Sequence, residues 1–401
     1  MKKSYWIRFS LLEISYWGFH ASFIGFLMSY LLSKGITNTM VSIFMASYLL
    51  AAFVGSFVWG MVCDRLHTNR KVSIMCFLAA GAVMFLIYFS YDNIPMLAVL
   101  YPMIGFVSLP HATNIDSWLL LVCENNLTVY GRIRCLPSLF FGVTSFVLGR
   151  LISDFGYSLM LVFGTVFLLM GIAAALSLPE GRDAVRDKGN DTAGFRLSSL
   201  DQVFASGSYR YMIVVLFFVG IAIAPVNNLK MPLLENVGGT VSDLGIDGFI
   251  CAVVQVPFIA LADRIERYSL RFRYVLLAGL PFLTLLLAFY AVSPVMIFAG
   301  SFLYNMGVGI LIPTMRSVTE RNVSPAYRNL GHNIADAIYS SLTGIISLLY
   351  SGLVMDLYGV RSLLMICLLV VLIPVIMTCS KLFSRMPVPC RCDGEKHGIS
   401  P

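Results

Sequence analysis

The sequence predicts an all-α membrane protein with twelve transmembrane helices in two six-helix halves, and three observations lead to this prediction. The chain of 401 residues is 58% hydrophobic and only 12% charged, with a mean hydropathy of +0.82, whereas a soluble domain carries about 25% charged residues. Its apolar spans are roughly 18–25 residues long, the length that crosses a bilayer. They show no alternation with period two, so we expect helices rather than the strands of a barrel.

The spans form two groups of six, separated by the longest polar stretch of the chain. The first group is expected near residues 6–32, 40–62, 72–91, 95–122, 133–152 and 158–178. The second group is expected near residues 210–234, 244–262, 274–292, 294–316, 329–352 and 361–383. These groups predict an N-terminal bundle (1–178), a cytoplasmic linker (179–208), a C-terminal bundle (209–383) and a cytoplasmic tail (384–401).

Basic residues are distributed unevenly between the two sides of the predicted bundle. With a cytoplasmic N-terminus, 24 of the 28 Lys and Arg residues fall in cytoplasmic loops and tails, as the positive-inside rule requires. We therefore expect both termini in the cytoplasm and a multi-pass protein of the cytoplasmic (inner) membrane. This distribution accounts for the net charge of +7, so no nucleic-acid partner is expected. Met1 precedes a full-length span, so no cleavable signal peptide is expected.

Several features recur in both halves. Asp64-Arg65 ends the second span and Asp263-Arg264 ends the eighth, while Asp154 and Asp356 occupy similar segments, GRLISDFG and GLVMDLYG. An even number of spans in each half predicts a parallel repeat with a pseudo-two-fold axis along the membrane normal. Transporters with this plan bind their solute near the bilayer midplane and move one half against the other.

The loop after the second span carries the motif GMVCDRLHTNRK, residues 60–71. It resembles the loop 2–3 signature of the major facilitator superfamily, with Gly60, Asp64, Arg65, Arg70 and Lys71 in the positions of that signature. Gly at such a position allows close helix approach, and Asp can pair with a basic group near a helix end. The resemblance implies a conformational latch between moving parts. The alternative is a loop whose charges only set the topology.

A carboxylate and an arginine interrupt the fourth and fifth spans. Asp116 and Arg134 are symmetric about Asn125 in the predicted turn, so an antiparallel helix pair would place them at the same depth. An unpaired Asp costs about 2.5–3.5 kcal/mol at the centre of a membrane helix. Pairing with Arg134 would remove much of that penalty. The pair is therefore a candidate for solute binding, or alternatively a structural link between the two helices.

The same stretch resembles the oligosaccharide–proton symporter (lactose permease-like) branch of the superfamily. The resemblance rests on an acid in the fourth span followed by the aromatic-Gly-Arg-x-Arg sequence YGRIR, residues 130–134. In that branch the acid and the second arginine bind sugar hydroxyls, which implies this role for Asp116 and Arg134. An aromatic that stacks on the sugar ring follows, and Phe141 occupies that position.

The second half departs from this branch. The branch couples protons through an acid on the eighth helix and charged residues on the tenth, but the tenth span here has no charge. Its polar residues include Ser301, Tyr304 and Asn305, and we count the last two as solute-binding candidates. Gln255 stands in the eighth span where relatives often have Glu, and Asp247 is expected near the outer end of that span.

Other polar residues lie within apolar spans and are candidates for binding or proton coupling. Glu13 and His20 share one face of the first span, where the alternatives are an interfacial Glu and a packing His. The fourth span adds His111 and Asn114. In the seventh span Asn227 and Asn228 suit a hydroxylated or amide-bearing solute, or join helices. Lys230 is expected to point outward to the membrane surface.

His332 and Asp336 are four residues apart in the eleventh span. They form either a proton relay or a local pair on one helix. Proton coupling is thus assigned to five candidates on three spans: Glu13, His20, His111, His332 and Asp336.

These patterns predict a secondary active transporter that moves a small polar solute, first a sugar or glycoside, by alternating access and proton-coupled symport. The alternatives are a proton-coupled exporter of amphipathic compounds and a non-transporting membrane sensor. We expect no enzyme activity, catalytic residues, cofactor or metal site. The expected partners are the solute, protons and the lipid bilayer, with the protein acting as a monomer. Cys390 and Cys392 in the tail have no assigned role.

Overall fold

A computed structural model describes residues 3–66, 68–122, 127–179, 198–260, 262–265 and 267–380. Within these ranges all regular structure is helical and no strand occurs. Eleven of the helices are long and apolar enough to cross a membrane. The first span is not among these eleven and makes the twelfth. It is helical without a break over residues 3–33, and a π-helical turn lies within it. The all-α prediction is therefore confirmed.

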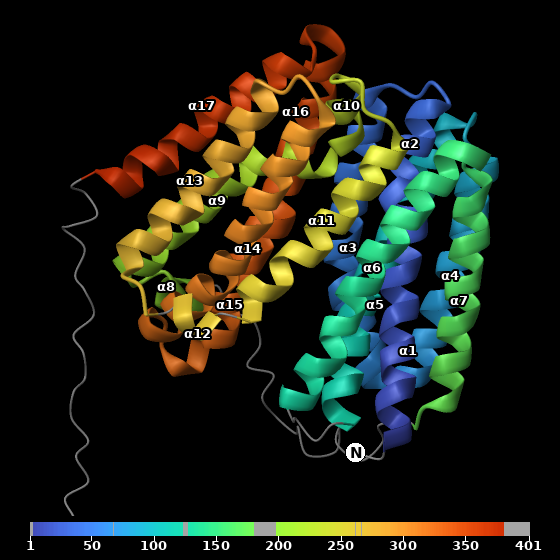
Figure 1. The fold of residues 1–401 in the computed structure, drawn as a ribbon. Coiled ribbons are helices and arrows are strands. Elements are labelled where there is room, and N and C mark those ends of the chain that lie inside the picture. Colours follow the sequence, from blue (N-terminus) through green and yellow to red (C-terminus); the bar gives the residue numbers. More distant parts are fainter. Residues whose placement is uncertain are drawn as a thin grey trace, which may run out of the picture.

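The helices before the linker form one half of the molecule (Figure 1). In chain order they are α1 (Lys3–Phe19), η1 (His20–Ile24), α2 (Gly25–Ser33), α3 (Asn38–Leu66), α4 (Asn69–Phe89), α5 (Ile94–Val122), α6 (Leu127–Phe155) and α7 (Ser158–Ser177). Helix α1 packs on α6 and α7, and α5 packs on α3 and α4. Because α1, η1 and α2 follow one another without a break, they act as one span.

The helices after the linker form the other half (Figure 1). The seventh to ninth spans comprise α9 (Gly207–Asn228), α11 (Val241–Ala260) and α13 (Leu270–Phe289), with the short helices α8 (Ser198–Val203), α10 (Lys230–Glu235) and α12 (Ala262–Ile265) beside them. The remaining elements are α14 (Pro294–Asn322), η2 (Pro325–Tyr327), α15 (Arg328–Asp336), η3 (Ala337–Leu342), α16 (Thr343–Tyr358) and α17 (Val360–Cys379).

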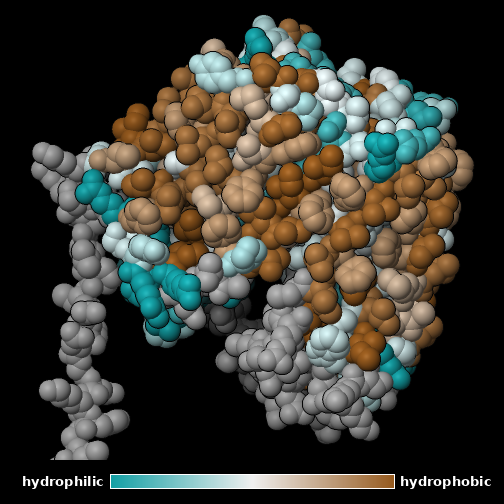
Figure 2. Space-filling view, viewed as in Figure 1, coloured by the Kyte–Doolittle hydropathy of each residue, from teal (hydrophilic) through white to brown (hydrophobic). Residues whose placement is uncertain are grey.

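Two helix pairs join the halves: α3 packs on α16, and α6 packs on α11. The two halves approach at the end of the bundle opposite the N-terminus, which we call the far end (Figure 1). Figure 2 shows a notch between the halves at the N-terminal end and an apolar surface over much of the visible face. Because lipid is the solvent for such a surface, large exposed side chains such as Phe57 and Leu369 are expected in a membrane protein.

Glycines allow the two pairs to pack with their backbones in contact. A Cβ at Gly245 of α11 would lie 2.5 Å from the Ser145 carbonyl oxygen of α6, and a Cβ at Gly149 would lie 2.8 Å from the Gly245 Cα. In the other pair, Gly352 of α16 lies against the Asn38 carbonyl at the start of α3. Small residues at a crossing are the usual means of close helix packing in a membrane, and here they hold the far end closed.

Candidate functional site

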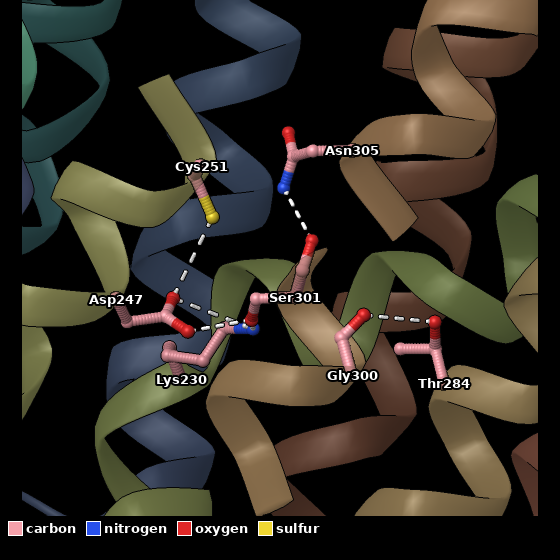
Figure 3. A network of polar contacts seen from close by, with 7 residues as sticks. All are labelled: Lys230, Asp247, Cys251, Thr284, Gly300, Ser301 and Asn305. Carbon is pink, nitrogen blue, oxygen red and sulfur yellow. Dashed lines mark hydrogen bonds and ion pairs between the residues drawn. The ribbon is translucent and has the colours of Figure 1, made fainter. Parts of the chain in front are cut away.

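A buried polar cluster joins three helices of the second half (Figure 3). The Lys230 ammonium of α10 lies 3.6 Å from an Asp247 carboxylate oxygen of α11. Lys230 Nζ also donates to Ser301 Oγ of α14 over 2.9 Å, and Ser301 Oγ donates to Asp247 Oδ1 over 2.5 Å. Only 9% of the Lys230 side chain and 5% of the Asp247 side chain are exposed. Two opposite charges are thus held inside the bundle with a hydroxyl between them.

The local sequence explains why these groups meet. Helix α9 ends at Asn228, and Leu229 departs from helical geometry (φ −111°, ψ 45°) before α10 begins at Lys230. The chain then turns through Gly238, which has φ 77°, a conformation that Gly adopts at little cost. Helix α11 runs back antiparallel and places Asp247 beside Lys230. The break at Leu229 therefore turns the lysine toward the protein interior, and the expectation that Lys230 points outward is wrong.

Further polar contacts surround the cluster on α11, α13 and α14 (Figure 3). Cys251, one turn after Asp247, places its thiol 3.7 Å from Asp247 Oδ2. Asn305 Nδ2 donates to the Ser301 carbonyl over 2.8 Å, one turn along α14. Thr284 of α13 donates to the neighbouring Gly300 carbonyl over 3.0 Å. These bonds fix the segment of α14 that carries Ser301, so the hydroxyl is held in position between the two charges.

Tyr304 and Tyr339 form a second polar contact in the same half. Their hydroxyls lie 3.2 Å apart, and Tyr339 belongs to the π-helical turn η3. Such turns are rare and often occur at functional sites. Of the two predicted asparagines of α9, Asn228 donates to the Ala224 carbonyl over 2.9 Å, so its amide is engaged within its own helix, while Asn227 is half-buried.

The first half contains an aromatic cluster on α1 and η1. Tyr16 donates to the Ser108 carbonyl of α5 over 3.0 Å, and Trp17 lies edge-on to Phe141 of α6 with ring centroids 6.2 Å apart. Glu13 and His20 are both buried. His20 opens the π-helical turn, and its Nε2 has no hydrogen-bond partner among the described residues. The structure therefore brings Phe141 close to the helix that carries Glu13 and His20.

Residues of α5 complete this half of the site. His111 is buried, and its Nε2 lies 2.6 Å from Ser73 Oγ of α4. Its ring also lies edge-on to Phe77 and Tyr16, with centroids 4.4 Å and 5.5 Å away. Asn114 and Asp116 are half-buried, and Asn114 Nδ2 is buried without a hydrogen-bond partner in the described part of the chain. His111 thus links α5 to α4.

Comparison with known proteins identifies the family. A sequence profile described as the MFS_1 like family matches residues 6–372. The chain belongs to this family. Two bacterial relatives are each 25% identical: the uncharacterized transporter YwbF of Bacillus subtilis over 272 residues, and the maltose permease of Geobacillus stearothermophilus over 270 residues. Each alignment covers 66% of this chain and 66% of the relative, so the chain spans slightly less than two thirds of their length.

Solved structures of other transporters share the fold. The nucleoside transporter NupG superposes with a TM-score of 0.79 at 15% identity, covering 94% of this chain and 98% of that one. A bacterial homologue of the human lysosomal transporter Spinster gives 0.67 at 12% identity, covering 94% and 97%. The prediction of a twelve-helix MFS fold is confirmed.

Several predicted residues of this MFS protein lie outside what the structure describes. The side chains of Arg134 and Asp64 are among them, as are residues 180–197 of the linker and residues 381–401 with Cys390 and Cys392. The pairing of Asp116 with Arg134 therefore stays a prediction. Arg65 is exposed and Arg70 is half-buried. Among the described residues, Gly60 mediates no close helix approach, because a Cβ there would meet none of them within 4 Å.

His332 and Asp336 lie on α15, at the N-terminal end of the bundle (Figure 1). His332 is half-buried and Asp336 is exposed. Within the described part of the chain no hydrogen bond or ion pair joins them. Neither residue belongs to the polar cluster of Figure 3.

The Lys230–Asp247 pair was missed from the sequence, although a signal for it exists. Lys230 lies eight residues before Gly238 and Asp247 lies eight residues after Gly239. This is the same symmetry about a turn that pairs Asp116 with Arg134. A turn at Gly238-Gly239 would therefore place Lys230 and Asp247 at the same depth on neighbouring segments. Asp247 does lie in the first half of α11, near the far end as expected, and its side chain is buried.

Proposed function

We propose that this MFS transporter is a proton-coupled symporter for a small polar solute, a sugar or glycoside in the first instance, in the cytoplasmic membrane. One observation carries the coupling: the buried Lys230–Asp247 ion pair bridged by Ser301. Intramembrane charges are costly and are usually kept for function. Similarity to a maltose permease supports the sugar, and similarity of fold to a nucleoside transporter makes nucleosides the second class to test.

The coupling follows from competition for one carboxylate. While Asp247 is ionised, it holds the Lys230 ammonium directly and through Ser301. A proton on Asp247 removes the charge that holds the ammonium, because the neutral acid no longer compensates it. The Asp247 carboxylate therefore holds either the proton or the Lys230 ammonium. A solute with hydroxyl or carbonyl oxygens can then accept hydrogen bonds from the released ammonium. This competition is what links the proton to the solute.

Solute binding is proposed between the halves, on the polar and aromatic residues that the sequence predicts for this role. In the first half these are Asp116, Arg134, Asn114 and Phe141, and in the second half Asn227, Asn228, Tyr304 and Asn305. Aromatic rings such as Phe141 beside Trp17 suit the apolar face of a sugar. Hydroxyls and amides suit its polar edge. With a cytoplasmic N-terminus, the notch opens to the cytoplasm, and Gly60, Asp64, Arg65 and Arg70 form the latch that would close that end.

Uptake into proteoliposomes under an inward proton gradient tests the proposal. Labelled sugars, nucleosides and aromatic acids are compared for the wild type, Asp247→Asn, Lys230→Met and the double variant. Accumulation of one class that a protonophore abolishes supports symport. Loss of accumulation in the double variant, with counterflow of the same solute retained, assigns coupling to this pair.

Two results contradict the proposal. Gradient-driven accumulation by the double variant at the wild-type level would make the pair structural and return coupling to Glu13, His20, His111, His332 or Asp336. Proton-driven efflux of amphipathic compounds by the wild type, without accumulation of any polar solute, would instead favour the exporter. The double variant is essential, because each single variant leaves one buried charge without its partner.

A further inference from the structure

Asp356 accepts three hydrogen bonds from the opposite half of the protein. It lies near the end of α16, and its partners lie at the start of α3. Thr39 donates to Asp356 Oδ2 through its backbone N–H over 2.8 Å and its hydroxyl over 2.5 Å, and Asn38 Nδ2 donates to Oδ1 over 2.9 Å. One carboxylate thus engages three donors across the boundary between the halves.

The donors belong to a helix terminus whose local cap serves a different group, because Thr37 Oγ1 accepts from the Met40 N–H over 3.3 Å. Helix α3 begins at Asn38, so the Thr39 N–H is one of the first four that lack a partner within the helix. Helix N-termini also carry partial positive charge, which favours a carboxylate. Asp356 therefore caps α3 from outside, with charge-assisted bonds that are stronger than neutral ones.

The backbones of α16 and α3 also lie close together next to this contact. Gly352, one turn before Asp356, lies so close to α3 that a Cβ would meet the Asn38 carbonyl and Ser42 Oγ. Gly359, with φ 81°, ends α16 three residues after Asp356. The contact lies at the far end, where the halves meet, and the notch opens at the other end (Figures 1 and 2).

We propose that Asp356 is the lock of the far-end gate: a positioning residue that holds α16 on α3 and must release all three donors before the solute site can open on that side. The inference requires transport by alternating access but neither a particular solute nor proton coupling. Loss of the lock is expected to shift the protein toward the conformation that is open at the far end.

The first half contains a matched control for the carboxylate. Asp154 occupies the similar segment GRLISDFG near the end of α6. It forms an ion pair with Arg150 of the same helix over 3.4 Å, and both side chains are exposed. Asp154→Asn therefore makes the same chemical change near the same end of the bundle without touching the contact between α3 and α16.

Distance measurements between spin labels test the lock without any solute. Labels at Asp92→Cys and Val292→Cys report the far end, since both positions are exposed in the turns α4–α5 and α13–α14. The nine native cysteines are replaced first. Asp356→Asn is expected to populate longer distances, with the ratio of open to closed forms raised roughly tenfold for the loss of one charge-assisted bond. Asp154→Asn is expected to match the wild type.

Thr39→Val provides a second variant that changes no charge. It removes only the hydroxyl donor, so its shift is expected in the same direction as that of Asp356→Asn but smaller. Identical distance distributions for the wild type, Asp356→Asn and Thr39→Val would overturn the proposal. So would an equal shift in Asp154→Asn, because the effect would then belong to the lost charge rather than to the cap. If the same preparations take up no solute, the proposed symport is contradicted, but the distance measurements still decide whether Asp356 holds the far end closed.

Discussion

The Lys230 ammonium and the Asp247 carboxylate lie 3.6 Å apart inside the second half, with 9% and 5% of their side chains exposed. Removing either charge from water costs several kcal/mol, and attraction offsets this cost only when geometry and additional hydrogen bonds are good. Ser301 supplies such bonds to both groups. Removing one charge alone would therefore leave the other buried without compensation.

This mutual dependence predicts the stability of variants in the pair. Lys230→Met leaves a buried carboxylate alone and is expected to lower the free energy of unfolding by about 3–5 kcal/mol. The double variant with Asp247→Asn has no uncompensated charge and should recover most of that loss. Unfolding in detergent, followed by tryptophan fluorescence or thermal aggregation, measures both. Strictly additive losses would show that the two residues do not act as a pair.

The fold could be predicted because the membrane limits the alternatives. Every backbone polar group must be satisfied within the span, so length and hydropathy alone indicate a helix. The predicted span 210–234, however, is two helices, α9 and α10. Pro225 lies within α9, and its carbonyl accepts from the Leu229 N–H over 2.8 Å where the helix ends. Hydropathy does not detect a break between two apolar segments.

The candidate site was less predictable, because it depends on the direction in which each side chain points. Ser73 lies in an apolar span with no sign that it bonds His111, a residue 38 positions away in the sequence. Likewise, Asp356 appeared in the sequence only as a repeat of Asp154, yet one bonds across the halves and the other within its own helix. Helix rotation and pairing decide these contacts, and neither follows from local sequence.

His111 is expected to act as a structural residue through its bond to Ser73. Ser73→Ala leaves a buried ring nitrogen without a partner, and we expect the free energy of unfolding to fall by about 1–3 kcal/mol. Ser47→Ala is the control, because the Ser47 hydroxyl bonds the Phe44 carbonyl of its own helix over 2.7 Å. The pH profile of uptake should be unchanged in Ser73→Ala. A shifted profile would instead assign His111 to proton coupling.

The glycine contact between α6 and α11 predicts a conformational effect at the far end. A Cβ at Gly245 would lie 2.5 Å from the Ser145 carbonyl, so Gly245→Ala must separate the two helices. We expect a cysteine introduced at Ser145, which is buried at this contact, to become more accessible to a membrane-impermeant thiol reagent, and transport to become slower. Gly279→Ala in α13 is the control, since nothing lies within 4 Å of its Cβ position and alanine favours a helix by about 1 kcal/mol. Equal labelling of both variants would contradict the prediction.

Asp116 is expected to affect solute binding rather than proton coupling. It lies half-buried on α5, in the half that carries Trp17 and Phe141, whereas the Lys230–Asp247 pair lies in the other half. Asp116→Asn keeps the shape of the side chain but removes the charge that would orient solute hydroxyls. A charged hydrogen bond contributes about 1.5–3 kcal/mol, so the KM should rise roughly tenfold or more.

The accumulation reached by Asp116→Asn at saturating solute should stay near the wild-type level, because the coupling carboxylate is intact. Asp154→Asn, which changes an exposed carboxylate, should alter neither quantity. An unchanged KM in Asp116→Asn would make this residue a structural partner on α5 and direct the search for the solute to Asn227, Tyr304 and Asn305.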